Sequence, residues 1–150
     1  MKQIKKILFP CDLTENASKI LPYVLSIADK YESEVYLLHV VEDLLAWGRY
    51  FVPHTSVDIF QKEAMEGAEK VMNTLCEEQL QSCPNFHRKV VSGDPAGKIL
   101  KTIESEDIDL VVMGSHGRRG LEHVIFGSVA ESVLKKSAAP VLVVNPFKVK

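Results

Sequence analysis

No apolar run in this 150-residue chain approaches the roughly 20 residues that a membrane-spanning helix needs. The start, MKQIKKILFPCDLTE, also lacks the apolar core and small-residue cleavage site of a signal peptide. Basic and acidic residues number 18 and 20, which gives a net charge of −2, and no long run carries one sign. We therefore expect no membrane span. Nucleic acid is not an expected partner either, because its binding needs a basic patch.

Cysteine is scarce and follows no motif. The three cysteines, Cys11, Cys76 and Cys83, are odd in number and form no Cys-x-x-Cys pair, which disfavours a disulfide framework. Free thiols with structural roles fit a reducing compartment, so a cytoplasmic protein is expected. With 46% hydrophobic and 25% charged residues, the composition is that of a folded protein. The length predicts one domain over residues 1–150.

Runs rich in valine, isoleucine and leucine recur along the chain and predict strands. They span residues 4–10, 34–41, 86–92, 108–113 and 140–145. Four of them contain continuous apolar stretches, as strands do when helices cover both faces, which is how parallel sheets are built. The segments between them repeat apolar residues at intervals of three and four, which predicts helices.

Local signals mark the ends of these helices. Thr14 can cap the first helix, and Asp94 followed by Pro95 places a cap and an N-terminal proline at the third. Pro22 removes a backbone hydrogen bond, so it should kink the first helix or mark its exposed side. The apolar rows are Ala17, Ile20, Leu21, Val24, Leu25 and Ala28; then, over about 57–82, Phe60, Ala64, Ala68, Val71 and Leu75; then Ile99, Leu100 and Ile103; and finally Ala130, Val133 and Leu134.

The resulting order, βαβαβαβαβ, predicts a doubly wound, Rossmann-like α/β fold: a five-stranded parallel sheet of order 3-2-1-4-5 with helices on both faces. Ligands of such sheets bind at the carboxyl ends of the strands, where the winding reverses. The loops PCDLTEN (10–16) and GSHGRRG (114–120) follow the first and fourth strands, and this order places them side by side. Residues 42–56, which hold Trp47, are interpreted as a lid or contact surface, or else as an ordinary excursion of the chain.

Glycines after the fourth strand indicate a ligand that approaches the main chain closely. Gly114 and Gly117 lie three residues apart, and Gly127 with Ser128 opens a helical pattern. Glycine exposes backbone N–H groups, and a helix start offers unpaired donors with a partial positive charge, which suits phosphate. Arg118 and its neighbour Arg119 would add full charges. Glycines that only form turns, and arginines that are only solvated, are the alternatives.

The segment GSHGRRGLEHVIFGS matches, at every defined position, the Gly-x-x-Gly, nine residues, Gly-Ser signature of ATP-binding universal stress proteins. The chain resembles that family from end to end, in KKILFPCDLTENASKIL, EVYLLHVVED, SGDPAGKIL, DLVVMGSHGR and PVLVV. The resemblance implies an ATP-binding, dimeric stress-response protein without enzymatic activity. It also implies a homodimer through the C-terminal strand, in keeping with the apolar run PVLVVN at a sheet edge.

The resemblance also implies roles for individual residues. Asp12 contacts the ribose, Pro10 and Cys11 line the adenine side, and the backbone of Val40 pairs with the adenine edge. Met113 and Gly114 close the base and ribose pocket, while Gly117, Gly127, Ser128 and Val129 hold the phosphates, with charge from Arg118. Asp12 as a simple helix cap and His39 as a hydrogen-bonded core residue are the structural alternatives. A zinc site at His116 and His123 is not expected, since no cysteine or carboxylate pair is near them in sequence.

Two other functions stay open at this stage. An ATPase or phosphate-transferring enzyme would need metal-holding acids and a positioned nucleophile, and GDPAGKI (93–99) fails the P-loop pattern in spacing and in Ile99. Slow ATP hydrolysis therefore remains the enzymatic alternative. An interaction module that binds AMP, ADP or no nucleotide is the second. Mg²⁺ or Mn²⁺ would enter through the phosphates, since no protein metal site is predicted.

Overall fold

The computed structural model describes residues 1–43, 54–83, 85–116 and 126–149. Strands and helices alternate along these residues: β1 Lys6–Pro10, α1 Glu15–Tyr31, β2 Glu34–Glu42, α3 His54–Gln79, β3 Phe86–Gly93, α4 Pro95–Ser105, β4 Leu110–Gly114, α5 Ser128–Lys136 and β5 Val141–Val144. Each predicted strand and helix is present, with its ends shifted by a few residues. No helix in the described part of the chain is both long and apolar enough to cross a membrane.

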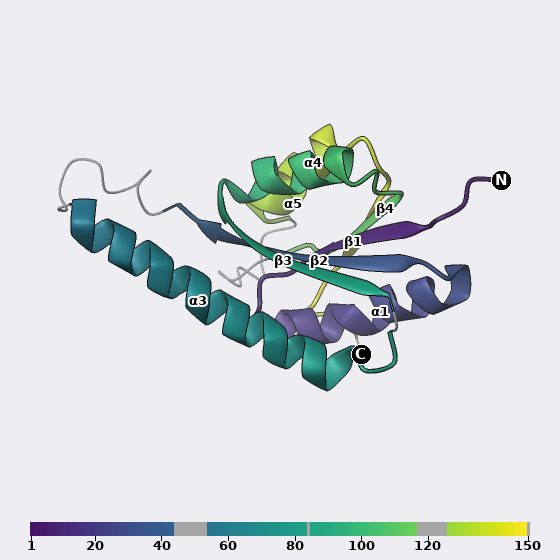
Figure 1. Cartoon of the computed structure of the whole chain (residues 1–150). Coiled ribbons are helices and arrows are strands. Elements are labelled where there is room, and N and C mark those ends of the chain that lie inside the picture. Colours follow the sequence, from purple (N-terminus) through teal and green to yellow (C-terminus); the bar gives the residue numbers. More distant parts are fainter. Residues whose placement is uncertain (44–53, 84, 117–125, 150) are drawn as a thin grey trace.

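The strands form one parallel sheet of order β3-β2-β1-β4-β5, which confirms the predicted topology. Helices α1 and α3 cover one face of the sheet, and α4 and α5 cover the other (Figure 1). Successive strand residues point to opposite faces, so Ile7 and Phe9 join the core under α1 and α3, and Leu8 joins the core under α4 and α5. This arrangement explains why four of the predicted strands contain continuous apolar stretches.

The helix ends follow from the local sequence. The Thr14 side chain caps α1 by accepting a hydrogen bond from the Asn16 N–H at 3.3 Å, and Asp94 caps α4 by accepting one from the Gly97 N–H at 2.7 Å. Pro22 lies on the exposed side of α1, which is one of the two consequences predicted for it. One prediction on α5 is wrong: Leu134 is 39% exposed, because the core face of this short helix is formed by Ala130 and Val133.

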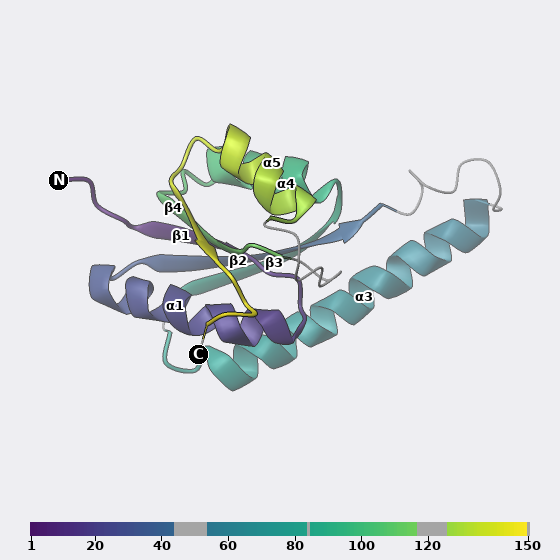
Figure 2. The same cartoon turned by 180° about the vertical axis from the view of Figure 1, so that it is seen from behind.

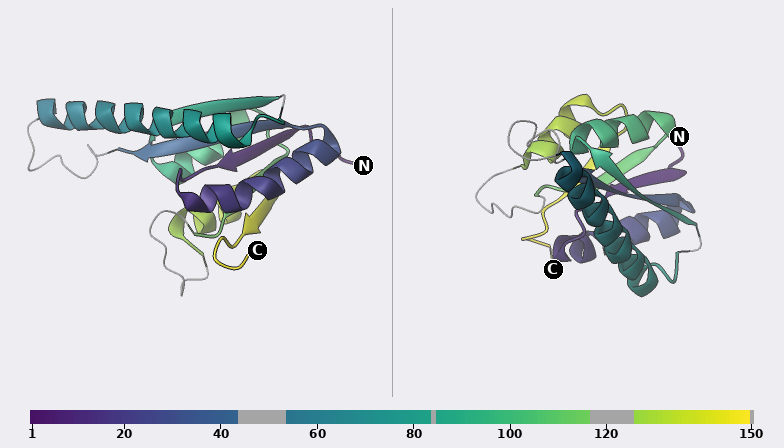
Figure 3. Two further views of the ribbon diagram at one scale, coloured as in Figure 1. Left: turned by 90° about the horizontal axis from the view of Figure 1, so that it is seen from below. Right: turned by 60° about the vertical axis from the view of Figure 1, so that its left-hand side comes forward.

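The apolar row predicted for the second helix does not form a core face along its whole length. Phe60 is 59% exposed and Val71 is 48% exposed, whereas Met72 and Cys76, one position further round, are buried. Phe60 is exposed because the N-terminal half of α3 extends beyond the sheet (Figures 1 and 3). Val71, in the other half, lies to one side of the buried row that Met72 and Cys76 form. A helical repeat indicates an apolar face, but it does not indicate how much of that face meets the sheet.

Candidate functional site at the carboxyl ends of the strands

A cleft of about 1010 Å³ opens at the carboxyl ends of β1, β2 and β4, where the winding of the sheet reverses. This volume lies at the upper end of the range for small-molecule sites, about 300–1,000 Å³. Its lining includes Pro10, Cys11, Asp12, Val40, Met113, Gly114, Gly127, Ser128 and Val129. The structure thus brings together nine of the predicted site residues. Gly117 and Arg118 lie outside the described residues, as do Arg119, His123 and most of the predicted 42–56 segment.

Asp12 shapes the turn between β1 and α1. Its Oδ1 accepts hydrogen bonds from the Thr14 N–H at 2.9 Å and the Thr14 hydroxyl at 2.7 Å. Leu13, between them, is held in the left-handed region at φ 58°, a conformation that costs energy for a residue with a side chain. Asp12 therefore stabilises the turn, although the helix cap itself is Thr14. Within the described part of the chain Oδ2 has no hydrogen-bond partner, so it can serve a ligand.

Val40 lies on the part of β2 that extends beyond the end of β1. Pairing with β1 ends at Leu38, whose carbonyl accepts from the Cys11 N–H at 2.8 Å, whereas pairing with β3 continues to Glu42. Alternate residues of a strand direct their main-chain groups to the same side. The N–H and C=O of Val40, two residues after Leu38, therefore face the side of β2 on which β1 has already ended. They are thereby available to the edge of a flat base.

His39 is a hydrogen-bonded, buried residue, as the structural interpretation predicted. It is 7% exposed, and its Nδ1 lies 2.7 Å from the carbonyl oxygen of Cys11. A carbonyl can only accept, so this contact places a proton on Nδ1. The contact holds the β1 turn against the end of β2.

Gly114 has a packing role that the sequence did not reveal. A Cβ added there would lie 2.9 Å from Cδ1 of Ile20 and 3.1 Å from the carbonyl oxygen of His116. Both distances are tighter than ordinary Cβ contacts, so a larger residue would force the end of the Ile20 side chain on α1 and the turn that follows β4 to shift. The lack of a side chain at Gly114 therefore allows α1 to pack closely, in addition to leaving space in the cleft.

The start of α5 presents unpaired donors to the cleft. Gly127 is its N-cap with no side-chain cap, and the Gly127 N–H donates to the Ser115 carbonyl at 2.7 Å. The N–H groups of Ser128, Val129 and Ala130 have no acceptor among the described residues. Three open N–H groups and the helix dipole produce a positive potential without a charged side chain. This is the chemistry that binds phosphate oxygens.

Sequence reasoning missed several residues of the cleft. Helix α3 contributes Ala64, Gly67, Ala68 and Val71 to its wall, and a Cβ on Gly67 would meet nothing within 4 Å. Small residues on the row predicted as core were the available signal. Ser115 and His116 also line the cleft, buried behind Gly114. Their place directly after a buried strand could have indicated them.

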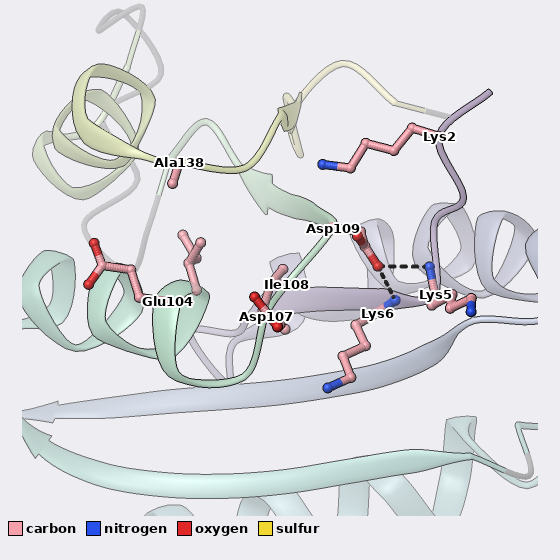
Figure 4. Close-up of a pocket in the computed structure, with 9 residues that line it drawn as sticks. Lys2, Lys5, Lys6, Glu104, Asp107, Ile108, Asp109 and Ala138 are labelled. Atoms are coloured by element: carbon pink, nitrogen blue, oxygen red, sulfur yellow. Dashed lines mark hydrogen bonds between the residues drawn. The ribbon is translucent and has the colours of Figure 1, made fainter.

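A second hollow of about 680 Å³ lies at the opposite, amino-terminal edge of the sheet (Figure 4). Two of its charged groups already have partners: the Asp109 carboxylate accepts from the backbone N–H groups of Lys5 and Lys6, and the Lys6 ammonium donates to the Glu106 carbonyl. Lysines and acids alternate around it, so no single sign of charge dominates. Nor does any group of three or more histidine, cysteine or acidic residues in the described ranges form a metal site.

The thiols differ in their surroundings, which predicts selective labelling. Burial raises the pKa of Cys11 to about 12, and burial also raises the pKa of Cys76. Only about one in ten thousand Cys11 side chains is then a thiolate at pH 8, so Cys11 should not be alkylated in the folded state. Cys76 should be protected because it is buried. We expect iodoacetamide to add a single group, at the half-buried Cys83, by mass spectrometry. Cys83→Ser should remove that adduct, and Cys11 labelling as fast as Cys83 would contradict its burial.

The fold and the cleft define a doubly wound α/β protein. At its switch point lies a helix N-terminus whose open N–H groups suit an anion. The sequence profile of the Universal stress protein family matches residues 3–145. The chain belongs to this family.

Individual relatives agree along nearly the whole chain. Universal stress protein MJ0577 of Methanocaldococcus jannaschii is 35% identical, with 94% of each chain covered, and MJ0531 of the same organism is 32% identical, with 96% of this chain and 84% of the relative covered. A solved structure of MJ0577 superposes with a TM-score of 0.84 at 33% identity, covering 96% and 97% of the two chains. The fold is also that of UspA from Lactobacillus plantarum, with a TM-score of 0.83 at 22% identity and 97% and 100% covered.

Proposed function

We propose that this protein binds an adenine nucleotide, ATP foremost, in the cleft at the carboxyl ends of the strands, and acts as a nucleotide-responsive regulator in stress rather than as an enzyme. The observation that carries the proposal is the pairing of two chemistries in one cleft. Open N–H groups at the start of α5 suit phosphates, and the Asp12 carboxylate suits the hydroxyls of a ribose. A nucleotide carries both phosphates and ribose hydroxyls.

Each part of a nucleotide has a matching group. The main chain of Val40, beyond the end of β1, would pair with the adenine edge, with Pro10, Cys11 and Met113 as apolar walls. The backbone at Gly127, Ser128 and Val129 would hold the phosphates. Gly117 and Arg118 are proposed to add to the phosphate site on the strength of the sequence motif alone. A divalent cation such as Mg²⁺ or Mn²⁺ would enter bound to the phosphates.

Solved relatives support an adenine nucleotide as ligand. One universal stress protein was solved in complex with cAMP (TM-score 0.62, 15% identity), and one from Archaeoglobus fulgidus in complex with dAMP (TM-score 0.56, 18% identity). At such identities only the fold is shared, so the preference of this chain rests on its own cleft. The run of open donors at α5 favours a polyphosphate over a monophosphate.

The cleft is poor in groups for catalysis. Among the described lining residues the acids are Asp12 and Glu42, and Asp12 already accepts two hydrogen bonds in its turn. Phosphoryl transfer needs several metal-holding acids and a positioned nucleophile. These features favour binding over turnover. Slow hydrolysis is the second candidate, and chromatography of the nucleotide after incubation with the protein would detect it as accumulating ADP.

Asp12 offers a direct test of the proposed function. Asp12→Asn keeps an oxygen that can accept from Thr14 but replaces the other carboxylate oxygen by an NH₂ group, which cannot accept from a ribose hydroxyl. We expect ATP affinity to fall about tenfold or more, the loss of one hydrogen bond to a charged group. Calorimetric titration measures the affinity, and mass spectrometry of nucleotide released from the purified parent identifies the ligand.

Asp12→Ala is the matched control, because it removes both the ribose acceptor and the turn. It should lose ATP affinity to a similar extent and also lower the melting temperature, whereas Asp12→Asn should melt close to the parent. If Asp12→Asn bound ATP as tightly as the parent, the role of Asp12 would be limited to stabilising the turn. A parent that neither retains nor binds an adenine nucleotide would remove the proposed function.

The two edges of the sheet support a homodimer through β5. The edge strand β3 carries exposed His87, Arg88 and Lys89, charges of the kind that prevent edge-to-edge pairing. The opposite edge strand β5 is apolar throughout, and Leu142 on it is 40% exposed. An apolar, uncharged edge invites pairing with a second copy. The free cysteines support a cytoplasmic setting for this dimer.

A further inference from the structure

His116 is a buried histidine that lines the cleft beside the proposed phosphate site, and the proposed function gives it no role. It follows β4 directly and is 6% exposed, and its Nδ1 lies 2.6 Å from the hydroxyl of Ser115, which is 3% exposed. The other side of the imidazole meets Phe147 edge-on, with ring centroids 5.3 Å apart and planes inclined by 62°. His116 thus joins the end of β4 to the segment that follows β5.

Ser115 connects the contact between His116 and Phe147 to the cleft. Its N–H donates to the Val144 carbonyl at the end of β5, at 2.8 Å, and its carbonyl accepts from the Gly127 N–H at 2.7 Å. The second bond fixes the N-cap of α5, which has no side-chain cap of its own. The orientation of the Ser115 peptide therefore determines where the open N–H groups of α5 point.

Phe147 belongs to a closed turn rather than to a loose tail. Its N–H donates to the Asn145 side-chain oxygen at 3.0 Å, and the Asn145 carbonyl accepts from the N–H groups of Lys148 and Val149 at 3.1 and 3.2 Å. Val149 packs against the core on the α1 side, and the chain after β5 runs past α1 (Figure 2). The turn at residues 145–149 is thus anchored independently of the cleft.

We infer that His116 is a positioning residue: with Ser115 it couples the C-terminal turn at residues 145–149 to the start of α5, so that this turn supports phosphate affinity without contributing to base affinity. The inference rests on the proposed function. The groups assigned to base and ribose, Val40 and Asp12, lie on β2 and after β1, whereas Phe147 follows β5, which β4 separates from β1. The rival interpretation is that His116 and Phe147 only fill space.

The test compares ATP with adenosine, which lacks phosphates, in calorimetric titrations of the full chain. Phe147→Ala removes the ring contact from outside the cleft. We expect it to weaken ATP binding about five- to tenfold, and adenosine binding less than about twofold. Val149→Ala, in the same turn, removes a side chain that packs against the core on the α1 side; it is the matched control and should change neither. Melting temperatures establish that each variant is folded.

A second pair of variants tests the hydrogen bond itself, even if Phe147→Ala does not fold. His116→Asn keeps a polar atom near the place of Nδ1 for Ser115, whereas His116→Leu has no hydrogen-bonding atom. The asparagine variant should retain more ATP affinity than the leucine variant, with adenosine affinity equal in both. Equal ATP affinities in this pair, or parallel losses for ATP and adenosine, would overturn the inference and leave nucleotide binding intact. A parent that binds neither ligand would remove the proposed function, and this inference with it.

Discussion

Replacing Gly127 with valine should abolish measurable ATP binding while the protein stays folded. Gly127 caps α5 at φ −68° and ψ 160°, extended backbone that any L residue adopts, so valine introduces no backbone strain. Valine is a poor N-cap, but that costs only about 1 kcal/mol, well below the stability of a typical domain. Its branched side chain would stand beside the open N–H groups of α5. Losing two hydrogen bonds to a charged ligand, at about 1.5–3 kcal/mol each, lowers affinity at least about a hundredfold.

Matched substitutions separate a blocked phosphate site from a damaged helix. Gly127→Ser supplies a favoured N-cap with a smaller side chain, so α5 should gain stability while ATP binding falls less than with valine. Ser128→Ala leaves the backbone donors in place and should weaken ATP binding by about 1.5–3 kcal/mol, the loss of one hydrogen bond to a charged group. Calorimetry with ATP and adenosine measures both effects, and adenosine affinity should survive in all variants. ATP binding like the parent's in Gly127→Val would reduce the glycines to turn formers.

The sequence predicted the sheet order because each rule it used is local or topological. Continuous apolar strands indicated helices on both faces, and right-handed crossovers left few arrangements of them. The same topology placed the loops after β1 and β4 at one edge. The nine individual residues were assigned by the resemblance to the universal stress protein family, and the cleft brings all nine together. Caps at Thr14 and Asp94 were predictable because a cap depends only on neighbouring residues.

What the sequence could not predict depends on how far each element extends in space. The row Phe60, Ala64, Ala68 and Val71 has helical spacing, but spacing cannot show that α3 extends beyond the sheet and turns part of this row to the cleft. The packing of Ile20 against Gly114 likewise joins residues far apart in sequence. The contact of His116 with Phe147 is of the same kind. Periodicity and motifs carry no information on such pairs.

Leu142→Lys should convert the proposed dimer into folded monomers. Leu142 is 40% exposed on the edge strand β5, so a lysine there costs the single chain little buried apolar surface. At an edge-to-edge contact the lysines that replace Leu142 in the two copies would meet across the two-fold axis. The contact would lose apolar surface, and two like charges would face each other. Light scattering should report about 16.8 kDa for the variant and twice that mass for the parent.

The choice of position decides how clearly the experiment can be interpreted. Val143→Lys addresses the same strand, but Val143 is half-buried and pairs with Met113, so a monomer could reflect a disturbed sheet. Lys89→Glu, on the exposed and charged edge strand β3, is the control and should leave the dimer unchanged. Melting temperatures near that of the parent would establish that each variant is folded. A dimer that persists in both variants would place the interface away from β5, because an apolar edge cannot bury an unpaired lysine from each chain.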